Sequence, residues 1–203
     1  MTDERGRTLR WPLVLLVAWM TMTPPLTALA ATLRVMPGQS IQAAIDAAAP
    51  GDTIEVERGL YPGALRIDKA LTLRGINRPT IDGLLLANTI SVQAEHVTID
   101  GLIIRNSGGE TRYQHAGVYL YPGSHHAVVR HCDFSYTLFG LWIEKANDVR
   151  IENNLITGKR DFNSSQRGNG IQLYNTRRAR IIGNNISFVR DAIYVDVSHD
   201  AIF

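Results

Sequence analysis

Residues 149–156, VRIENNLI, and residues 179–186, ARIIGNNI, are two copies of one repeated segment that decides the fold. Related segments occupy residues 97–104, VTIDGLII, and 127–134, AVVRHCDF, and a fifth copy begins at Ala201. The copies start 30, 22, 30 and 22 residues apart. A 22-residue unit made of short strands cannot bury its own apolar face, so it must stack on its neighbours.

A second short segment precedes each copy, in which apolar residues that point inward alternate with residues that point outward. These segments are residues 90–92, 118–120, 141–143, 171–173 and 193–195. Stacked coils of such strands pair at about 4.8 Å, the spacing of neighbouring strands in a sheet. The sequence therefore predicts an all-β fold, a right-handed parallel β-helix. Leucine-rich repeats would need a Leu-x-x-Leu-x-Leu pattern that is missing here, and propeller blades would need about twice the length.

Two further columns support stacked coils. Cys132, Asn154 and Asn184 share one repeat position, where a buried Asn can bond turn backbone and the Asn of the next coil. A glycine also recurs before the alternating strand, as expected of a tight corner. These glycines are Gly117, Gly140 and Gly170.

The N-terminal part differs from the repeats. Residues 40–49 have helical spacing with Ser40 as N-cap, and we expect this amphipathic helix to cover the open end of the solenoid. The chain ends three residues into a new repeat, which predicts truncation at the C-terminus. The expected organisation is a signal peptide at 1–30, a strand and capping helix at 31–52, and incomplete β-helix repeats at 53–203.

The first thirty residues resemble an export signal. Arg5, Arg7 and Arg10 precede the short apolar run 11–20, and residues 28–30, ALA, form a small-x-small cleavage site. We expect a cleavable signal peptide and a periplasmic mature chain that does not span the membrane. The alternative is an uncleaved anchor, although the apolar run is short for a bilayer and Pro24 and Pro25 follow it.

Composition narrows the class of protein. The 203 residues carry a formal charge of +2, with 45% hydrophobic and 20% charged residues, as in one globular domain or two small ones. No dense Lys/Arg block indicates nucleic acid as a partner. A single cysteine excludes an internal disulfide.

Strand alternation separates inward from outward side chains. The inward set is Val118, Leu120, Leu141, Ile143, Ile171, Leu173, Ile193 and Val195. The two outward columns are Tyr119, Trp142, Gln172, Tyr194 and Tyr121, Glu144, Tyr174, Asp196. A row of exposed aromatic residues favours docking of a sugar or a protein partner. The alternative is that the long loops fold over these rings and bury them.

Two insertions occur at equivalent positions two coils apart, at residues 107–115 and 158–167. Because these positions are equivalent, we expect both loops on the same side, along one edge of the aromatic strip. Loops on a rigid scaffold often carry function. Plain loop extensions are the alternative. The predicted partner-binding surface comprises Tyr119, Trp142, Tyr174, Tyr194, Tyr113, Arg160, Asp161, Phe162 and Arg167.

Histidines suggest one metal site. His96 and His126 share a turn position in adjacent coils, and His125 lies next to His126, so three imidazoles are candidate ligands for copper or zinc. Ordinary surface histidines are the alternative. We interpret Cys132, in the inward column, as an inert buried thiol rather than a Cu(I) ligand.

Carboxylates give no clear catalytic set. The outward column Asp100, Arg130, Glu152, Ile182 alternates in sign, which favours charge pairing across strands over a shared-proton pair. We therefore assign no catalytic residues. Two alternatives stay open: a polysaccharide lyase, hydrolase or epimerase that uses Asp100 or Glu152, and a carbohydrate-binding β-helix that uses Trp142.

Several segments resemble known families. Residues 40–54, SIQAAIDAAAPGDTI, with GLY at 59–61 and LTLRG at 71–75, resemble the start of pectin-lyase-like β-helices. Residues 158–175, GKRDFNSSQRGNGIQLYN, and 190–199, RDAIYVDVSH, resemble the NosD family more specifically. The likeness extends over the whole chain after the signal.

The resemblance implies a periplasmic, non-enzymatic accessory protein. Members of that family assist maturation of the copper-sulfur centre of nitrous oxide reductase. The implied partners are the membrane and ATPase subunits of an ABC-type transporter, a copper chaperone and the apo reductase, with copper as a transient ligand. No family motif matches His96, His125, His126 or Cys132, so the metal hypothesis rests on the three histidines alone.

Overall fold

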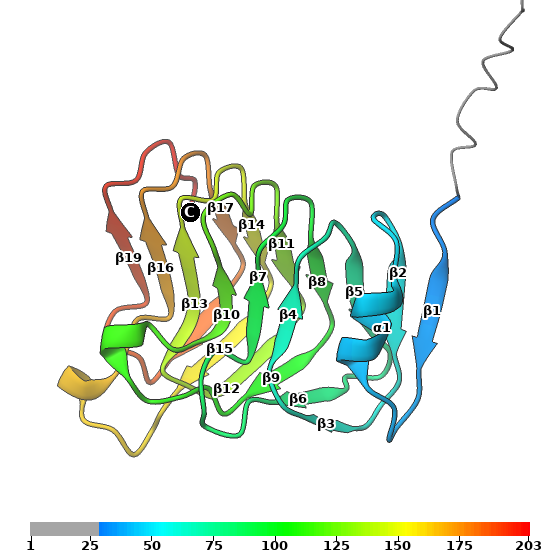
Figure 1. The fold of residues 1–203 in the computed structure, drawn as a ribbon. Helices are drawn as coiled ribbons and strands as arrows, with labels where there is room; N and C mark the ends of the chain where they lie inside the picture. The colour runs from blue at the N-terminus through cyan, green and yellow to red at the C-terminus, as the bar shows by residue number, and fades with distance from the viewer. Residues whose placement is uncertain (1–28) are drawn as a thin grey trace, which may run out of the picture.

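The computed structural model describes residues 29–203 as a stack of coils built from three parallel sheets (Figure 1). The predicted signal peptide, residues 1–30, lies almost entirely outside the described residues. Sheet A contains β1 (Thr32–Val35), β2 (Thr53–Val56), β5 (Thr72–Gly75), β8 (Thr98–Asp100), β11 (Val128–Arg130), β14 (Arg150–Glu152) and β17 (Arg180–Ile182). Sheet B contains β3 (Leu60–Pro62), β6 (Thr80–Asp82), β9 (Ile103–Arg105), β12 (Asp133–Thr137), β15 (Leu155–Gly158) and β18 (Asn185–Ser187). Sheet C contains β4 (Leu65–Ile67), β7 (Ile90–Val92), β10 (Ala116–Leu120), β13 (Phe139–Glu144), β16 (Ile171–Tyr174) and β19 (Ile193–Asp196).

The repeat register of the sequence is the register of sheet A. Val129 pairs with Ile99 on one side and with Ile151 on the other, and Ile151 pairs with Ile181. All four side chains are buried, and they form one column of the core. This confirms the all-β fold of stacked parallel coils.

The corner from sheet C to sheet A uses a left-handed residue in successive coils. The residues at this corner with φ between 54° and 59° are His96, His126, Asp148, Arg178 and Asp200. His and Asp tolerate this conformation better than most residues, and each is followed by a small or β-branched residue that points into the core. The left-handed backbone of this corner therefore explains why His96 and His126 occur at this repeat position.

Sheet C confirms six of the eight predicted inward side chains. Those that are fully buried are Val118, Leu120, Leu141, Ile143, Ile171 and Leu173. Val195 and Ile193 keep the inward register, paired with Leu173 and Ile171, but Val195 is 45% exposed and Ile193 is only half-buried. Both lie on β19, which within residues 29–203 pairs with β16 alone, so no further coil covers them.

The predicted polar column holds the corner between sheets A and B. The Asn154 side chain accepts a hydrogen bond from the Cys132 N–H (3.0 Å) and donates to the Val129 carbonyl (3.0 Å) and to the Asn184 side chain (2.9 Å). Asn184 in turn accepts from the Asn154 N–H and donates to the Ile151 carbonyl. The ladder satisfies turn backbone that would otherwise be buried without partners.

The recurring glycines are needed for close packing rather than for a turn. Gly117 and Gly140 lie within β10 and β13, and neither has a positive φ. A Cβ on Gly140 would lie 2.5 Å from both the Gly170 carbonyl oxygen and Ile156 Cγ2. The corner explanation was wrong here, because the next coil passes too close for any side chain.

The predicted helix is α1 (Ile41–Ala47), and its N-cap Ser40 accepts a hydrogen bond from the Ala43 N–H. Ile41 and Ile45 are buried, and the helix contacts β1, β2 and β4. The Gln42 side chain bonds both the N–H and the carbonyl of Arg66 on β4, as a neighbouring strand would.

Candidate docking surface and charged columns

The outward column of sheet C has the predicted register. Tyr119 pairs with Trp142, Trp142 with Gln172, and Gln172 with Tyr194. The expected open aromatic strip is not uniform, however. Tyr119 is 5% exposed and Trp142 is half-buried, whereas Tyr194 is 45% exposed. The alternative that loops cover the rings therefore applies to the part of the strip on β10 and β13.

A second apolar cluster lies outside the solenoid, between sheet C and the loops. We call it the outer cluster. Its buried members are Ala116, Tyr119, Leu138 and Phe139, with Tyr121, Trp142 and Phe162 packed against them. Phe162 comes from the 158–167 loop, so the insertion itself supplies part of the cover. The Phe139 ring meets Trp142 edge-on at 5.0 Å, and Tyr121 stacks on Tyr119 at 4.1 Å. The cluster anchors one loop to the scaffold.

Lys159 joins the two insertions, which confirms that they lie on the same side (Figure 1, green and gold short helices). Its side chain is buried, and the ammonium donates to the carbonyls of Ser107 (3.1 Å) and Tyr136 (3.3 Å). It also lies 3.9 Å from the centre of the Tyr136 ring. Burial lowers the pKa of Lys159 to about 8. We call this contact the loop clasp.

The outer rim of the loops carries exposed aromatic and basic groups. Each loop contains a short 3-10 helix, Thr111–Tyr113 or Ser164–Gln166. Tyr113 is 55% exposed, with the Arg112 guanidinium 4.5 Å from its ring centre. Arg160 lies over the Phe188 ring at 4.4 Å, and Arg167 donates to the Lys159 and Arg160 carbonyls. Asp161 accepts a 2.7 Å hydrogen bond from the Tyr136 hydroxyl. Arg167 and Asp161 thus hold the loop, whereas Tyr113 and Arg160 face outward.

Sequence reasoning placed the loops but missed the groups that hold them. Lys159 gave no signal of burial, because an isolated lysine in a loop normally lies at the surface. Ser107 gave none either, yet its hydroxyl accepts from the Leu138 N–H at 2.8 Å. Both residues fix the loops from inside.

A cleft of about 420 Å³ opens beside Trp142 of the aromatic strip, toward the end of the solenoid that carries β19. It is lined by Gln114, Trp142, Glu144, Tyr174 and Asp196. Glu144, Tyr174 and Asp196 are successive members of one outward column, since Glu144 pairs with Tyr174 and Tyr174 with Asp196. The Tyr119 hydroxyl donates to Glu144 at 2.5 Å. Burial first, and then this carboxylate, raise the pKa of Tyr119.

The structure brings together two of the three candidate metal ligands. The rings of His96 and His126 stack face to face, with centroids 4.7 Å apart and planes at 5°. The lone pairs of parallel rings lie in parallel planes and do not converge on one point. The His125 Nδ1 accepts a hydrogen bond from the Asn147 N–H at 2.9 Å, so the lone pair of that nitrogen is not free to bind a metal ion. Within residues 29–203, no three His, Cys, Asp or Glu side chains are arranged to hold a metal ion.

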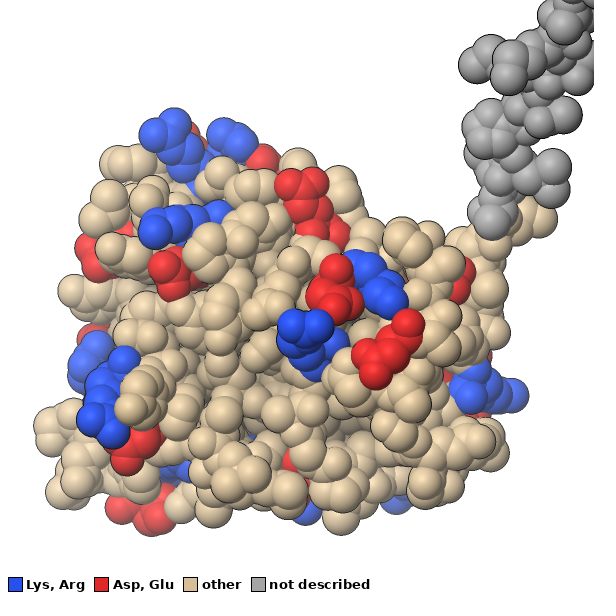
Figure 2. Space-filling view, viewed as in Figure 1, with Lys and Arg blue, Asp and Glu red and all other residues tan. Residues whose placement is uncertain are grey.

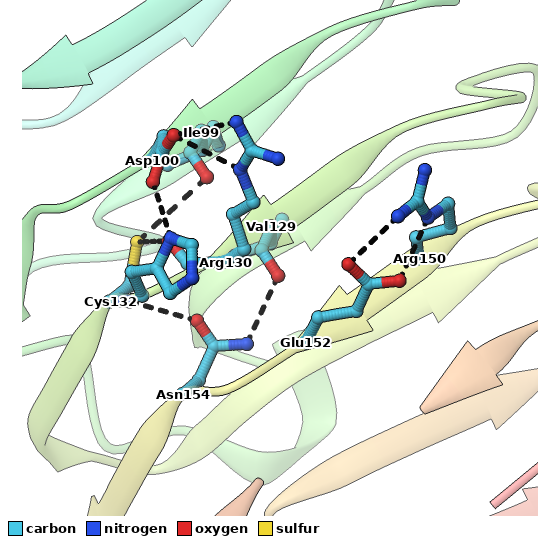
Figure 3. Close-up of polar contacts among 9 residues, drawn as sticks. Ile99, Asp100, Val129, Arg130, Cys132, Arg150, Glu152 and Asn154 are labelled. Atoms are coloured by element: carbon cyan, nitrogen blue, oxygen red, sulfur yellow. Dashed lines mark hydrogen bonds and ion pairs between the residues drawn. The ribbon is translucent and has the colours of Figure 1, made fainter. Parts of the chain in front are cut away.

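The carboxylates considered for catalysis are paired with arginines (Figure 3). Asp100 accepts hydrogen bonds from Arg130 (3.0 Å) and contacts the His131 Nδ1 (2.9 Å), and these outweigh burial, so that the pKa of Asp100 is lowered. Arg150 lowers the pKa of Glu152 through a 2.8 Å hydrogen bond. Both groups are thus held ionised, whereas a general acid needs a raised pKa. Cys132 is buried beside them, which raises the pKa of its thiol to about 12.

Stacked parallel coils with inward aliphatic columns, an Asn ladder and left-handed corners define a parallel β-helix protein. The family described as "Right handed beta helix region" matches residues 84–203, and the chain belongs to that family. More narrowly, the chain is similar to proteins named "Probable ABC transporter binding protein NosD". It is 30% identical over 133 residues to the one of Pseudomonas aeruginosa and 26% identical over 133 residues to the one of Stutzerimonas stutzeri.

These alignments cover 66% of the chain but only 31% and 30% of the two relatives, so the chain spans about a third of their length. Among solved structures, the pectin methylesterase from Aspergillus niger is 15% identical with a TM-score of 0.41, covering 82% of this chain and 85% of that one. In the described part, 29–203, no helix is long and apolar enough to cross a membrane.

Proposed function

We propose that this chain belongs to an exported accessory protein that docks on an ABC-type transporter complex and assists maturation of the copper-sulfur centre of nitrous oxide reductase. The observation that carries the proposal is the similarity to the two NosD proteins, whose names describe ABC transporter binding proteins. The proposed partners are the membrane and ATPase subunits of the transporter, a copper chaperone and the apo reductase. Periplasmic location and a cleavable signal at 1–30 are part of the same proposal.

The loop rim is the surface we propose for docking. It combines exposed Tyr113 with the cation Arg160, and aromatic and Arg residues are enriched at protein interfaces. The clasp at Lys159 and the packing of Phe162 fix both loops on a stacked core. A fixed surface loses little entropy on binding, which favours a scaffold role. We further propose that α1 protects the end of the solenoid, since Gln42 bonds the free edge of β4.

The proposal is tested in cells by deleting residues 161–166, which carry the exposed part of the second loop. We expect reduced copurification with the transporter subunits and reduced copper content of the reductase. Unchanged copurification and copper content in the deletion strain, at equal protein level, would refute the docking role of this loop.

Transient copper binding at His96, His125 and His126 stays a prediction. Its support is the close approach of His96 and His126. Anaerobic Cu(I) and Cu(II) titration of the full chain tests it, with His96→Gln and His126→Gln together as the variant. Copper affinity that falls in the variant would support direct handling, and equal affinity would rule out this pair as ligands.

A further inference from the structure

The cleft on sheet C places two carboxylates on either side of an aromatic ring. Glu144, Tyr174 and Asp196 occupy neighbouring strands in register, so the two acidic backbone positions are two strand spacings apart, roughly 9–10 Å. Trp142 lies two residues before Glu144 and faces the same side of the sheet, and Gln114 reaches the cleft from the 107–115 loop. The cleft thus has aromatic walls, acidic ends and an amide at its edge.

The carboxylates of this cleft differ from several other outward carboxylates of the solenoid. At those positions an arginine neutralises the acid, as in Asp82–Arg105 (2.9 Å), Asp100–Arg130 (2.9 Å) and Asp148–Arg178 (2.6 Å). Figure 2 has the view of Figure 1, with sheet C in front, and shows acidic and basic groups side by side at several places on this face.

In the cleft, the cation nearest to Glu144 is its exposed neighbour Lys145, with Nζ 3.8 Å from the carboxylate. Within residues 29–203, no Lys, Arg or His nitrogen lies within 4.0 Å of the Asp196 carboxylate. Two acids in one cleft therefore lack the arginine partner that this scaffold provides at other positions.

We propose that this cleft binds an organic cation, a guanidinium or ammonium group such as an Arg or Lys side chain presented by a partner protein. A cation in the cleft forms charge-assisted hydrogen bonds with Glu144 or with Asp196. The rings of Trp142 and Tyr174 add cation–π attraction, which is strongest for Trp. The Tyr119 hydroxyl fixes the Glu144 carboxylate in place, so little ordering is needed on binding.

The geometry favours an organic cation over a metal ion. Calcium needs six to eight oxygens at about 2.3–2.6 Å, and magnesium an octahedral set at about 2.0–2.1 Å. Two acids based two strands apart with a tyrosine between them do not supply such a set. A guanidinium or ammonium on a side-chain stem is long enough to contact both a carboxylate and the rings. This binding does not depend on the transporter, so it is tested without partners.

The test is a titration of the full chain with acetyl-arginine amide and acetyl-lysine amide, followed by the indole N–H signal of Trp142 in nitrogen-proton NMR spectra. Acetyl-citrulline amide is the matched neutral probe, because it keeps the shape of arginine without its charge. We expect millimolar affinity for the cations, at least tenfold weaker affinity for citrulline, and weakening by salt. The Trp142 signal is assigned with Trp142→Phe.

Variants separate the cleft from general charge effects. Glu144→Gln with Asp196→Asn should weaken cation binding at least tenfold, whereas Asp68→Asn, beside β4 at the other end of sheet C, should leave it unchanged. Equal shifts with citrulline, or unchanged affinity in the double variant with a native spectrum, would overturn the proposal. A Trp142 shift with N-acetylglucosamine and none with either cation would also overturn it and indicate a sugar site.

Discussion

The ammonium of Lys159 donates a 3.1 Å hydrogen bond to the carbonyl of Ser107. Ser107 lies 52 positions earlier in the chain, in the other insertion loop. The contact is buried, and the Tyr136 carbonyl and ring complete the environment of the lysine. One side chain thus fixes the relative position of two loops that the sequence separates by two coils. The proposed docking rim depends on this contact.

Lys159 should make stability depend on alkaline pH. Its pKa is about 8 in the folded chain and about 10.4 in an unfolded one, so between these values the unfolded chain binds more protons. Through Lys159 alone, stability is therefore expected to rise as pH increases from about 8 toward 10, whereas the buried Cys132 thiol, whose pKa is raised to about 12, makes the opposite contribution over much of this range. Thermal unfolding followed between pH 7 and 10 tests this, with Lys159→Met expected to remove the rise. A difference in stability between the wild type and Lys159→Met that stays flat or falls over pH 8–9.5 would contradict the burial of the charged amine.

Asn154→Ala should destabilise the stack. The substitution leaves the Cys132 N–H buried without a partner and removes the hydrogen bond to the Val129 carbonyl, which costs ~1–3 kcal/mol. Chemical denaturation measures the loss. Asn185→Ala, in the next coil with an exposed side chain, is the control and should change stability by less than ~0.5 kcal/mol. Similar losses in both variants would show that the ladder has no special role.

Gly140→Ala should be poorly tolerated, because the added methyl group meets backbone of the next coil at 2.5 Å. Overpacking against a carbonyl that cannot move aside is expected to cost ~3 kcal/mol in unfolding free energy. Gly109→Ala is the matched control, since its added carbon meets Phe162 at an ordinary 3.7 Å. If Gly140→Ala unfolds at the same denaturant concentration as Gly109→Ala, the coils are stacked too loosely for the 2.5 Å approach to matter.

The Cys132 thiol should be inert in the folded protein. It is buried, and burial raises its pKa to about 12, so almost no thiolate exists near neutral pH. A disulfide reagent added at pH 8 is expected to label the chain only after unfolding. Rapid labelling of the native chain would mean that the corner at Cys132 opens readily.

The sequence was sufficient for features that follow a strict period. Val118 and Leu141 were predicted inward because alternation along a strand leaves no other choice, and Asn154 was placed on Asn184 because coil spacing fixes both. Features that depend on how neighbouring loops fold could not be predicted from the repeat period. The burial of Lys159 and of Tyr119 depends on how the insertions fold back, and the sequence of an irregular loop carries no period from which to infer it. The reason why glycine is needed at position 140 was also missed. It depends on how closely the next coil approaches, and a repeat pattern does not contain that distance.

The exposed rim suits direct tests of docking, since Tyr113 and Arg160 can be changed without touching the clasp. Binding of the full chain to the purified membrane and ATPase subunits of the transporter is the most direct measurement, with Tyr113→Ala/Arg160→Glu as the rim variant. Arg177→Glu, an equally exposed arginine just before the opposite corner, is the control. The proposed docking role predicts that wild type and Arg177→Glu bind alike and that the rim variant binds at least tenfold more weakly. Equal binding by all three proteins, or none by the wild type, would contradict it.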